Sequence, residues 1–366
     1  MGTRTENRYT YEPDIVYAPG ETLIEWLDEH GMTQTDLAAR MGLSAKHVNQ
    51  IAKGAAPVTT ETALGLEQVT RVPAAFWNNL ELNYRAHLTR CAELERLAQD
   101  VDWLDELPVA ELVKRGWITK GTTGAERVRE VCSFFGVASV AVWRDIWEQP
   151  VAAYRASRAF SKDPGAVAAW LRIGEIEGSK LECEGFSKSG LRALLPELRS
   201  LTNEADPAVW VPAVRERCRH VGVAFVVEPE IRGSRLNGAT RWLGPNKALV
   251  QISTRHKRHD IAWFTLFHEI GHLLLHSKKE TFINDGDSIG AVEQEADAFA
   301  SRVLIPPEQE PELGHLNSAA DATRFAHLIG IGPGIVVGRL QHMGWWKHSE
   351  GKDLQWRFDW PPEQRG

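Results

Sequence analysis

The feature that most constrains this chain is the run DIAWFTLFHEIGHLLLHS at residues 260–277, its most apolar stretch of that length, which nevertheless carries three histidines and a glutamate. Its length and apolar character predict a buried helix, although imidazoles and carboxylates are costly to bury without partners. His268 and His272 are one helical turn apart, so two imidazole nitrogens can reach one cation. Glu269 lies on the adjacent flank, within reach of a water held by that cation. This HExxH spacing is typical of zinc peptidases.

A second helix, predicted over residues 291–304 (AVEQEADAFASRVL), offers a third ligand. Four of its residues share one face at helical spacing: Glu293, Ala296, Asp297 and Ala300. Glu293 is the predicted third ligand, and Asp297 is predicted to accept a hydrogen bond from a ligand histidine, which fixes the tautomer of that ring. The two alanines would let the helices approach closely. Glu295 is the alternative ligand, although it points away from this face.

His276 lies one further turn along the first helix and has two possible roles. Three ligands from three successive turns of a straight helix converge poorly on one tetrahedral ion, so a supporting role behind His272 or at the helix end is favoured. The alternative is a fourth protein ligand, in which case the zinc would be purely structural.

Three protein ligands would leave one coordination position for water, whose pKa zinc lowers to about 7. Glu269 is the predicted general base, which takes the proton of that water and returns it to the leaving amine when a peptide bond is cleaved. Turn residues separate two predicted strands, 239–243 and 248–253. Either strand could hold an extended substrate along its edge, and Arg241 and His259 are candidates for stabilising the oxyanion.

The N-terminal part predicts a different kind of site. Residues 20–54 contain three short helical segments, ETLIEWLDEH, TQTDLAARM and SAKHVNQIAK, joined by turns that contain glycine. Thr33 and Ser44 are the predicted N-caps of the second and third helices, and Gly42 makes the turn between them. Two short helices joined by such a turn form a helix-turn-helix unit, whose second helix enters the major groove of DNA.

The outward face of that last helix carries side chains suited to DNA. Asparagine and glutamine match adenine edges, lysine matches guanine or phosphate, and Gln34 is placed to reach a backbone phosphate. Residues 37–60 contain three basic side chains and no acidic one, although the whole chain has a net charge of −7. The predicted DNA-binding residues are Gln34, Ser44, Ala45, Lys46, His47, Asn49, Gln50 and Lys53. The alternative is that these side chains are ordinary solvated surface.

The length of 366 residues is too great for one ordinary core. Changes in pattern predict five segments, namely a flexible arm at 1–18, a DNA-binding domain at 19–85, a helical middle domain at 86–205, a peptidase domain at 206–346 and a polar tail at 347–366. The predicted fold class is mostly α with an α+β C-terminal domain. No run is apolar enough for a signal peptide or a membrane span, and the four cysteines form no CxxC pair, so we expect a cytoplasmic protein with reduced thiols.

The N-terminal part resembles a known family of regulators. Residues 20–54, with VTTETALGLEQVTRVPAAFWNNLELNYR after them, are similar to the XRE/HigA-type antitoxin repressors. The resemblance implies a five-helix lambda-repressor-like domain. It also implies a homodimer that binds a palindromic operator in double-stranded DNA, because two-fold protein symmetry matches two-fold operator symmetry.

The C-terminal part resembles the ImmA/IrrE family of metallopeptidases through three segments: STRHKRHDIAWFTLFHEIGHLLLHSKKETFIND, EQEADAFASRVLIPP and GIGPGIVVGRLQHMGWW. This resemblance implies a zincin-like domain of gluzincin type, with His268, His272 and Glu293 as Zn²⁺ ligands and Glu269 as general base. It also implies cleavage of a transcriptional repressor. Asp297 stands where the family often has asparagine, a change that keeps the hydrogen bond to a ligand histidine.

Residues 321–344, DATRFAHLIGIGPGIVVGRLQHMG, also have a helix-turn-helix rhythm. Few basic residues lie on the second of these helices, so packing is the favoured role over DNA binding.

The sequence therefore predicts a DNA-binding transcriptional regulator with a zinc-dependent endopeptidase domain, which cleaves a repressor or a toxin–antitoxin partner protein. The alternative is a HigA-like antitoxin or autorepressor whose zinc domain is a non-catalytic sensor or scaffold. Glu269→Gln separates the two hypotheses, because it abolishes cleavage under the first and changes nothing under the second.

Overall fold

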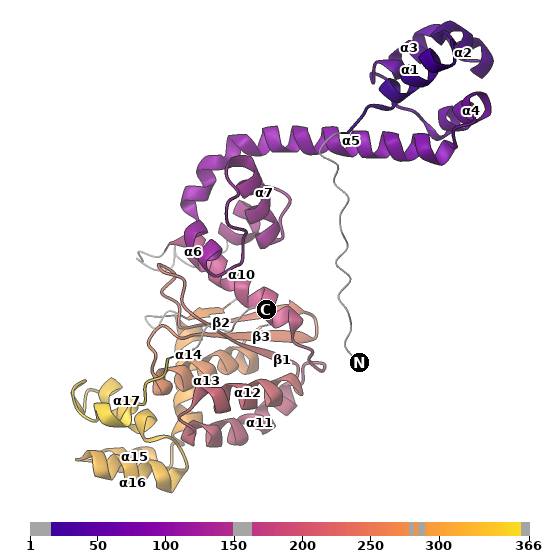
Figure 1. Ribbon diagram of the computed structural model, residues 1–366. Helices are drawn as coiled ribbons and strands as arrows, with labels where there is room; N and C mark the ends of the chain where they lie inside the picture. The colour runs from indigo at the N-terminus through magenta and orange to yellow at the C-terminus, as the bar shows by residue number, and fades with distance from the viewer. Residues whose placement is uncertain (1–15, 149–162, 278–281, 285–289, 360–366) are drawn as a thin grey trace. The chain divides into compact units, whose positions relative to one another are not determined.

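The computed structural model describes residues 16–148, 163–277, 282–284 and 290–359 (Figure 1). The chain forms two compact units, Met1–Val101 with Gly124–Arg129, and Asp102–Thr123 with Glu130–Gly366. Helices dominate both units, and the strands lie in the second unit. The predicted fold class, mostly α with an α+β C-terminal part, is therefore confirmed. Most of the predicted arm lies outside the described residues.

The first unit contains the five helices that the resemblance implied: α1 (Pro19–Glu29), α2 (Gln34–Met41), α3 (Ala45–Ala52), α4 (Thr60–Thr70) and α5 (Ala74–Leu97). Their apolar faces meet in one core, which includes Leu23, Leu37, Val48, Leu66 and Trp77. These residues recur at helical spacing, so each short helix buries one stripe and leaves its polar face in solvent.

The predicted caps set the ends of α2 and α3. Thr33 and Asp36 form a capping box, in which the Thr33 hydroxyl accepts from the Asp36 N–H at 3.1 Å and the Asp36 carboxylate accepts from the Thr33 N–H at 3.2 Å. Gly42 ends α2 in a left-handed conformation at φ 65°. Ser44 caps α3 by accepting from the His47 N–H at 3.2 Å. The turn between the two helices is thus held by local hydrogen bonds.

Helix α5 runs without a break across the boundary predicted between residues 85 and 86. No glycine or proline occurs between Ala74 and Leu97 to end it. Further helices follow, namely the 3₁₀ helix η1 (Ala98–Glu106), α6 (Val109–Lys114), α7 (Gly124–Phe135), α8 (Val140–Trp143), the short π-helix η2 (Arg144–Glu148), α10 (Pro164–Lys180), α11 (Lys188–Ser200), the 3₁₀ helix η3 (Leu201–Asn203) and α12 (Pro207–Arg219).

The second unit is built on a four-stranded sheet of order β1-β3-β2-β4, formed by β1 (Val223–Glu228), β2 (Gly238–Gly244), β3 (Lys247–Ser253) and β4 (Phe282–Asn284). Strands β2 and β3 form the predicted hairpin, closed by the pair Gly244 and Lys247. Strand β1 pairs with β3 in parallel, and β4 pairs with β2 in antiparallel orientation.

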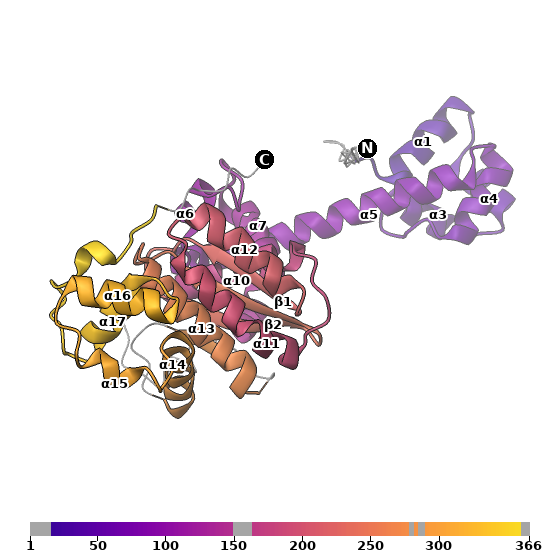
Figure 2. The ribbon, with the colours of Figure 1, turned by 90° about the horizontal axis from the view of Figure 1, so that it is seen from below.

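Helices cover both faces of this sheet (Figures 1 and 2). Side chains alternate along each strand, so Phe225 and Val250 join α11, α12 and α13 in one core, while Ala224 and Leu249 face α10. Helices α10 and α11, which lie in the predicted middle domain at 86–205, thus cover the two faces of this sheet.

The two helices predicted to carry the metal site are α13 (His259–Leu275) and α14 (Ala291–Leu304). They approach closely, since a Cβ added to Gly271 on α13 would lie 3.3 Å from the Ala296 Cα on α14. Ala296 and Ala300 are both buried at this contact. The predicted role of small residues in bringing the helices together is confirmed.

The C-terminal helices are α15 (Glu310–Leu313), α16 (Ala319–Ile329), α17 (Pro333–His342) and the 3₁₀ helix η4 (Lys352–Leu354). Most of α17 is buried, so the segment at residues 321–344, whose pattern resembled a second helix-turn-helix, has a packing role, as predicted. The predicted polar tail from residue 347 needs correction, because Phe358 lies in the main core and the His259 N–H donates to the Trp356 carbonyl at 3.0 Å. An aromatic side chain every second residue gives this segment apolar surface to bury.

Candidate metal centre and nucleic-acid interface

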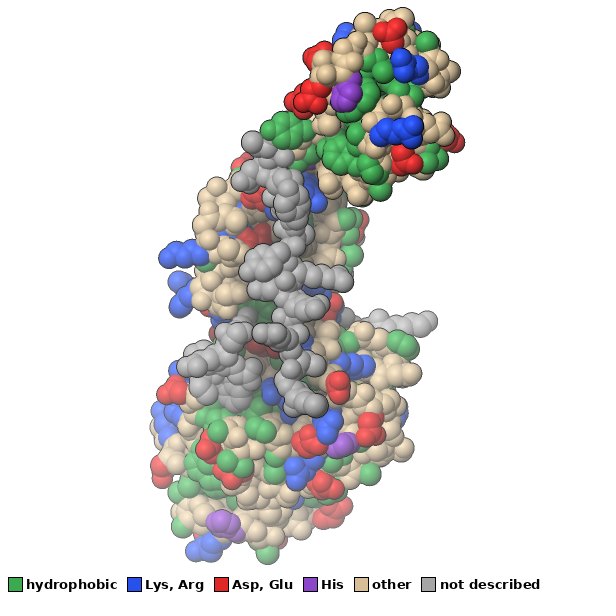
Figure 3. Space-filling view, turned by 45° about the vertical axis from the view of Figure 1, so that its right-hand side comes forward, with side chains coloured by type: hydrophobic (Ala, Val, Ile, Leu, Met, Phe, Trp, Pro, Cys, Tyr) green, Lys and Arg blue, Asp and Glu red, His purple; other side chains and the backbone are tan. Residues whose placement is uncertain are grey.

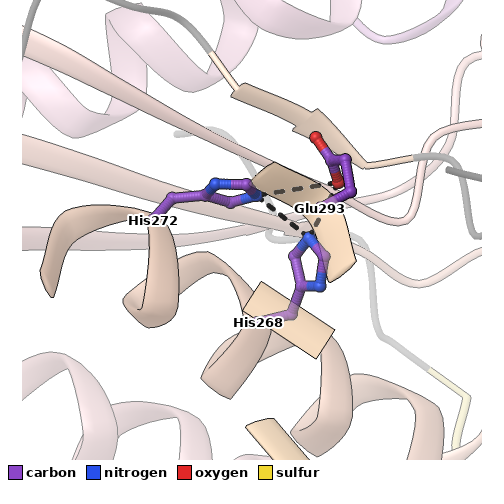
Figure 4. A group of neighbouring side chains, drawn as sticks. All are labelled: His268, His272 and Glu293. Atoms are coloured by element: carbon purple, nitrogen blue, oxygen red, sulfur yellow. Dashed lines mark hydrogen bonds and ion pairs between the residues drawn. The ribbon is translucent and has the colours of Figure 1, made fainter. Parts of the chain in front are cut away.

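Three predicted ligand atoms converge between α13 and α14 (Figure 4). His268 Nε2 and His272 Nε2 are 3.0 Å apart. Glu293 Oε2 lies 3.2 Å from the first nitrogen and 3.7 Å from the second. All three side chains are buried. The structure thus brings together the three residues that the sequence selected.

The groups behind the histidines lie where the sequence placed them. His268 Nδ1 donates to Asp297 Oδ1 at 2.7 Å, and His276 Nδ1 lies 3.0 Å from His272 Nδ1. Glu295 Oε2 is 3.2 Å from His276 Nε2, so Glu295 contacts a supporting histidine and is not part of the group of three. The ligand alternative that involved Glu295 is thereby disfavoured.

Glu269 is held by a residue that the sequence analysis missed. Its side chain is fully buried, and its Oε2 accepts a hydrogen bond of 2.7 Å from the Thr240 hydroxyl on β2. Its other oxygen, Oε1, has no partner among the described residues. Gly238, two residues before Thr240, makes room for this carboxylate, since an added Cβ would lie 2.5 Å from Oε1. Strand alternation places both residues on one face, but no local pattern pairs that face with Glu269.

Burial and the neighbouring carboxylates act in opposite directions on the charge of the two histidines. Burial lowers the pKa of His272. Burial acts against charge on His268 as well, but hydrogen bonds to Asp297 and Glu293 outweigh it and raise the pKa of His268 to about 10. Burial alone would raise the pKa of Glu293, yet its contacts with the two histidines hold that pKa at about 2. The carboxylates therefore favour positive charge among the imidazole nitrogens.

The donor set fits zinc. Two imidazoles and one carboxylate are a known catalytic zinc set, and bonds of about 2.0–2.1 Å in a tetrahedral site place neighbouring ligand atoms about 3.3 Å apart. The three separations here, 3.0, 3.2 and 3.7 Å, bracket that value. The unpartnered Glu269 Oε1 beside them is the kind of buried polar atom that a water at the fourth position would satisfy.

Two predictions about the surroundings of the site are wrong. Strand β3 is interior to the sheet, and β4 pairs with β2 at residues 238–240, so among the described residues neither predicted strand offers a free edge at 238–240. Arg241 faces α10, where it contacts Glu175 at 3.3 Å. His259 is buried nine residues before His268 and hydrogen-bonds to the Glu204 carbonyl. The short strand β4 was not expected, and among the described strands it forms the edge of the sheet on that side.

The predicted DNA-binding residues lie on α3 and at the start of α2. Ser44, Ala45, Lys46, Gln50 and Lys53 are exposed, while Gln34, His47 and Asn49 are half-buried. Asn49 donates to the Gln34 side-chain oxygen at 3.1 Å, which ties α3 to α2. The exposed members lie on the surface of the described part of the first unit. Over the second unit, the view in Figure 3 shows acidic and basic side chains intermixed, with no broad basic patch on that face.

Comparison with known proteins assigns both ends of the chain. The family described as helix-turn-helix matches residues 23–77, and the family described as the IrrE N-terminal-like domain, Peptidase_M78, matches residues 236–341. The chain therefore combines a helix-turn-helix DNA-binding domain with an IrrE-like domain of metallopeptidase type. Among the described helices, none has the length and apolar character that crossing a membrane requires.

Solved structures similar to the chain include the Pseudomonas aeruginosa antitoxin HigA with the higBA promoter, at 28% identity over 22% of this chain and 90% of that one, with a TM-score of 0.22. An addiction module antidote protein of a HigA family from Coxiella burnetii is 28% identical over 24% of this chain and 95% of that one, with a TM-score of 0.22. No curated protein matches the chain.

Proposed function

We propose that this chain is a DNA-binding transcriptional regulator with a zinc-dependent endopeptidase domain that cleaves a repressor or a toxin–antitoxin partner protein. The observation that carries the proposal is the meeting of buried ligand atoms from His268, His272 and Glu293 within 4.8 Å of one another. A purely structural zinc site takes a fourth protein ligand. His276 turns its nitrogens to His272 Nδ1 and Glu295 instead, which supports an open fourth position.

Glu269 is the proposed general base. Zinc, when bound, supplies a Lewis acid that polarises a peptide carbonyl and makes water acidic near neutral pH. Thr240 holds Glu269 Oε2, so Oε1 is the oxygen left to accept a proton. Burial raises the pKa of Glu269 to about 8, which suits a group that must take a proton and then return it to the leaving amine.

The substrate is proposed to lie as an extended strand along β4. Within the described part of the sheet, β4 pairs only with β2, so its outer edge remains unpaired. Phe282 on this strand stacks on the His272 ring, with ring centroids 4.2 Å apart, and therefore places the edge beside the ligands. Backbone hydrogen bonds would give affinity for a polypeptide of any sequence, and side-chain contacts would select among substrates.

The helix-turn-helix domain is proposed to bind a palindromic operator as a homodimer, with α3 in the major groove. Lys46, Gln50 and Lys53 are the exposed side chains available for base and phosphate contacts. Few basic groups lie on this face, so we expect moderate affinity with a marked dependence on salt concentration.

The test of this proposal compares zinc-loaded wild type with Glu269→Gln. Each protein is incubated with the proteins encoded beside its gene and with itself, and cleavage is followed by mass spectrometry. Bound zinc is measured in parallel. Glu308→Gln, which removes one charge from an exposed side chain, is the matched control.

We expect cleavage by wild type and by Glu308→Gln, and none by Glu269→Gln, with one zinc per chain in all three. If wild type binds zinc but cuts none of these proteins, the endopeptidase assignment fails and the domain is a sensor or scaffold in an antitoxin or autorepressor. If wild type binds no zinc, the metal site itself is refuted.

A further inference from the structure

Two side chains outside the group formed by His268, His272 and Glu293 contact the His272 ring, and a third acts behind them. Phe282 stacks on the ring face at an interplanar angle of 10°. His272 Nδ1 lies 3.0 Å from His276 Nδ1, on the side of the ring away from Glu293. The His276 ring in turn reaches Glu295 Oε2 through Nε2 at 3.2 Å. A chain of contacts thus leads from the buried site to an exposed carboxylate on α14.

Metal binding would determine the direction of both hydrogen bonds in the series His272–His276–Glu295. If His272 Nε2 faces the cation with its lone pair, the neutral ring carries its proton on Nδ1. That N–H must donate to His276 Nδ1, which is therefore an unprotonated acceptor. The neutral His276 ring then carries its proton on Nε2 and donates it to Glu295. No other arrangement of neutral rings satisfies both contacts, because two N–H groups would otherwise face each other.

The other proposed histidine ligand, His268, contacts a carboxylate directly, with no second histidine between them. His268 Nδ1 donates directly to Asp297 Oδ1 at 2.7 Å. Both ligand rings are thus oriented by an acidic residue of α14, one directly and one through an imidazole. A carboxylate behind a ligand histidine fixes its tautomer and raises its basicity toward the metal.

We propose that Glu295 and His276 form a relay that presents the His272 Nε2 lone pair to the metal, so that affinity for the ion depends on an exposed side chain outside the ligand set. This inference rests on the proposed zinc site. His276 is a positioning residue, and neither of its nitrogens faces the group formed by His268, His272 and Glu293.

The experiment measures the affinity of the full-length protein for Zn²⁺ by competition with a chromogenic chelator, and the coordination of Co²⁺ by its visible absorption. His276→Leu removes the acceptor, and His276→Asn places an amide oxygen close to the position of Nδ1. Glu295→Ala removes the end of the relay, and Glu308→Ala is the control for loss of one exposed charge. Circular dichroism checks that each variant is folded.

We expect His276→Leu to weaken zinc binding about 10- to 100-fold, the range seen for groups behind metal-bound histidines. His276→Asn should recover most of that loss. Glu295→Ala should weaken binding several-fold in the wild-type background and have no effect in either His276 variant, since it acts only through that ring. The Co²⁺ spectrum should keep its tetrahedral form throughout, and Glu308→Ala should match wild type.

Several results would overturn the relay. The relay is refuted if His276→Leu leaves the affinity for Zn²⁺ unchanged. It is also refuted if Glu295→Ala lowers that affinity equally in the wild-type and His276 variant backgrounds. A changed coordination number in the Co²⁺ spectrum makes His276 a ligand, and a second bound ion lost with Glu295 makes the pair a separate site. If wild type binds no zinc, the proposed function fails as well, whereas normal zinc binding with insensitive variants refutes the relay alone.

Discussion

Replacing Glu269 with glutamine should stabilise the metal-free protein at alkaline pH. The carboxyl group is completely buried, and burial raises its pKa from an ordinary 4.5 to about 8. A carboxyl group whose pKa is higher in the folded state binds more protons when folded, so stability falls as the pH rises through this interval. At 1.36 kcal/mol per pH unit, the cost of ionising Glu269 in the folded chain reaches up to about 5 kcal/mol above pH 8.

Glutamine has nearly the same shape and never ionises, so the substitution removes this cost. We expect Glu269→Gln to differ little from wild type near pH 4.5. The free energy of unfolding should then favour the variant increasingly as the pH rises, and the difference should level off above pH 8. The assay is urea unfolding of the second unit at several pH values between 4.5 and 9, in the presence of a chelator, followed by tryptophan fluorescence.

Glu308→Gln is the control, and we expect it to stay within about 0.5 kcal/mol of wild type at every pH, as exposed substitutions usually do. A stability difference between Glu269→Gln and wild type that does not change with pH would show that the buried carboxyl group does not titrate in this interval. If the free energy of unfolding of wild type increases relative to that of Glu269→Gln as the pH rises, the reasoning is refuted entirely.

Three further predictions concern the surroundings of the two sites. Above pH 8, where Glu269 is ionised, Thr240→Val should lower the free energy of unfolding by about 1.5–3 kcal/mol, because it removes a hydrogen bond to a charged group, and Thr240→Ser should restore most of it in the same urea assay. Gly238→Ala should destabilise the second unit in thermal unfolding, because the new Cβ would lie 2.5 Å from Glu269 Oε1. Lys46→Gln should weaken binding to duplex DNA from the region upstream of its own gene and reduce the slope of log K against log salt by about 1, measured by fluorescence anisotropy; an unchanged slope would exclude a phosphate contact.

The residues of the predicted metal site could be selected from the sequence because they form two pairs of local neighbours. His268 and His272 are one turn apart on α13, and Glu293 and Asp297 are one turn apart on α14, so helix geometry alone places each pair on one face. The caps Thr33 and Ser44 were likewise predicted correctly, because a cap acts within three residues of itself.

Contacts between distant segments could not be read in this way. Thr240 and Glu269 are 29 residues apart and meet only because the sheet face carrying Gly238 and Thr240 packs on α13. The position of β4 beside β2, which corrected the predicted substrate edge, depends on strand pairing that no local pattern specifies. Phe358 joined the core for the same reason, since apolar spacing shows that a residue can be buried but not where.

The sequence by itself indicated the chemistry proposed for this protein: a helix-turn-helix with its caps, and two helices whose predicted metal-site residues are spaced one turn apart. It could do so because the backbone geometry of a helix relates residues three or four positions apart without help from the rest of the chain. Only the tertiary structure decided which oxygen of Glu269 has no partner among the described residues, which described strand forms the edge of the sheet beside the site, and that His276 connects His272 to Glu295. Those relations arise where separate elements pack, and packing depends on the whole set of buried faces at once.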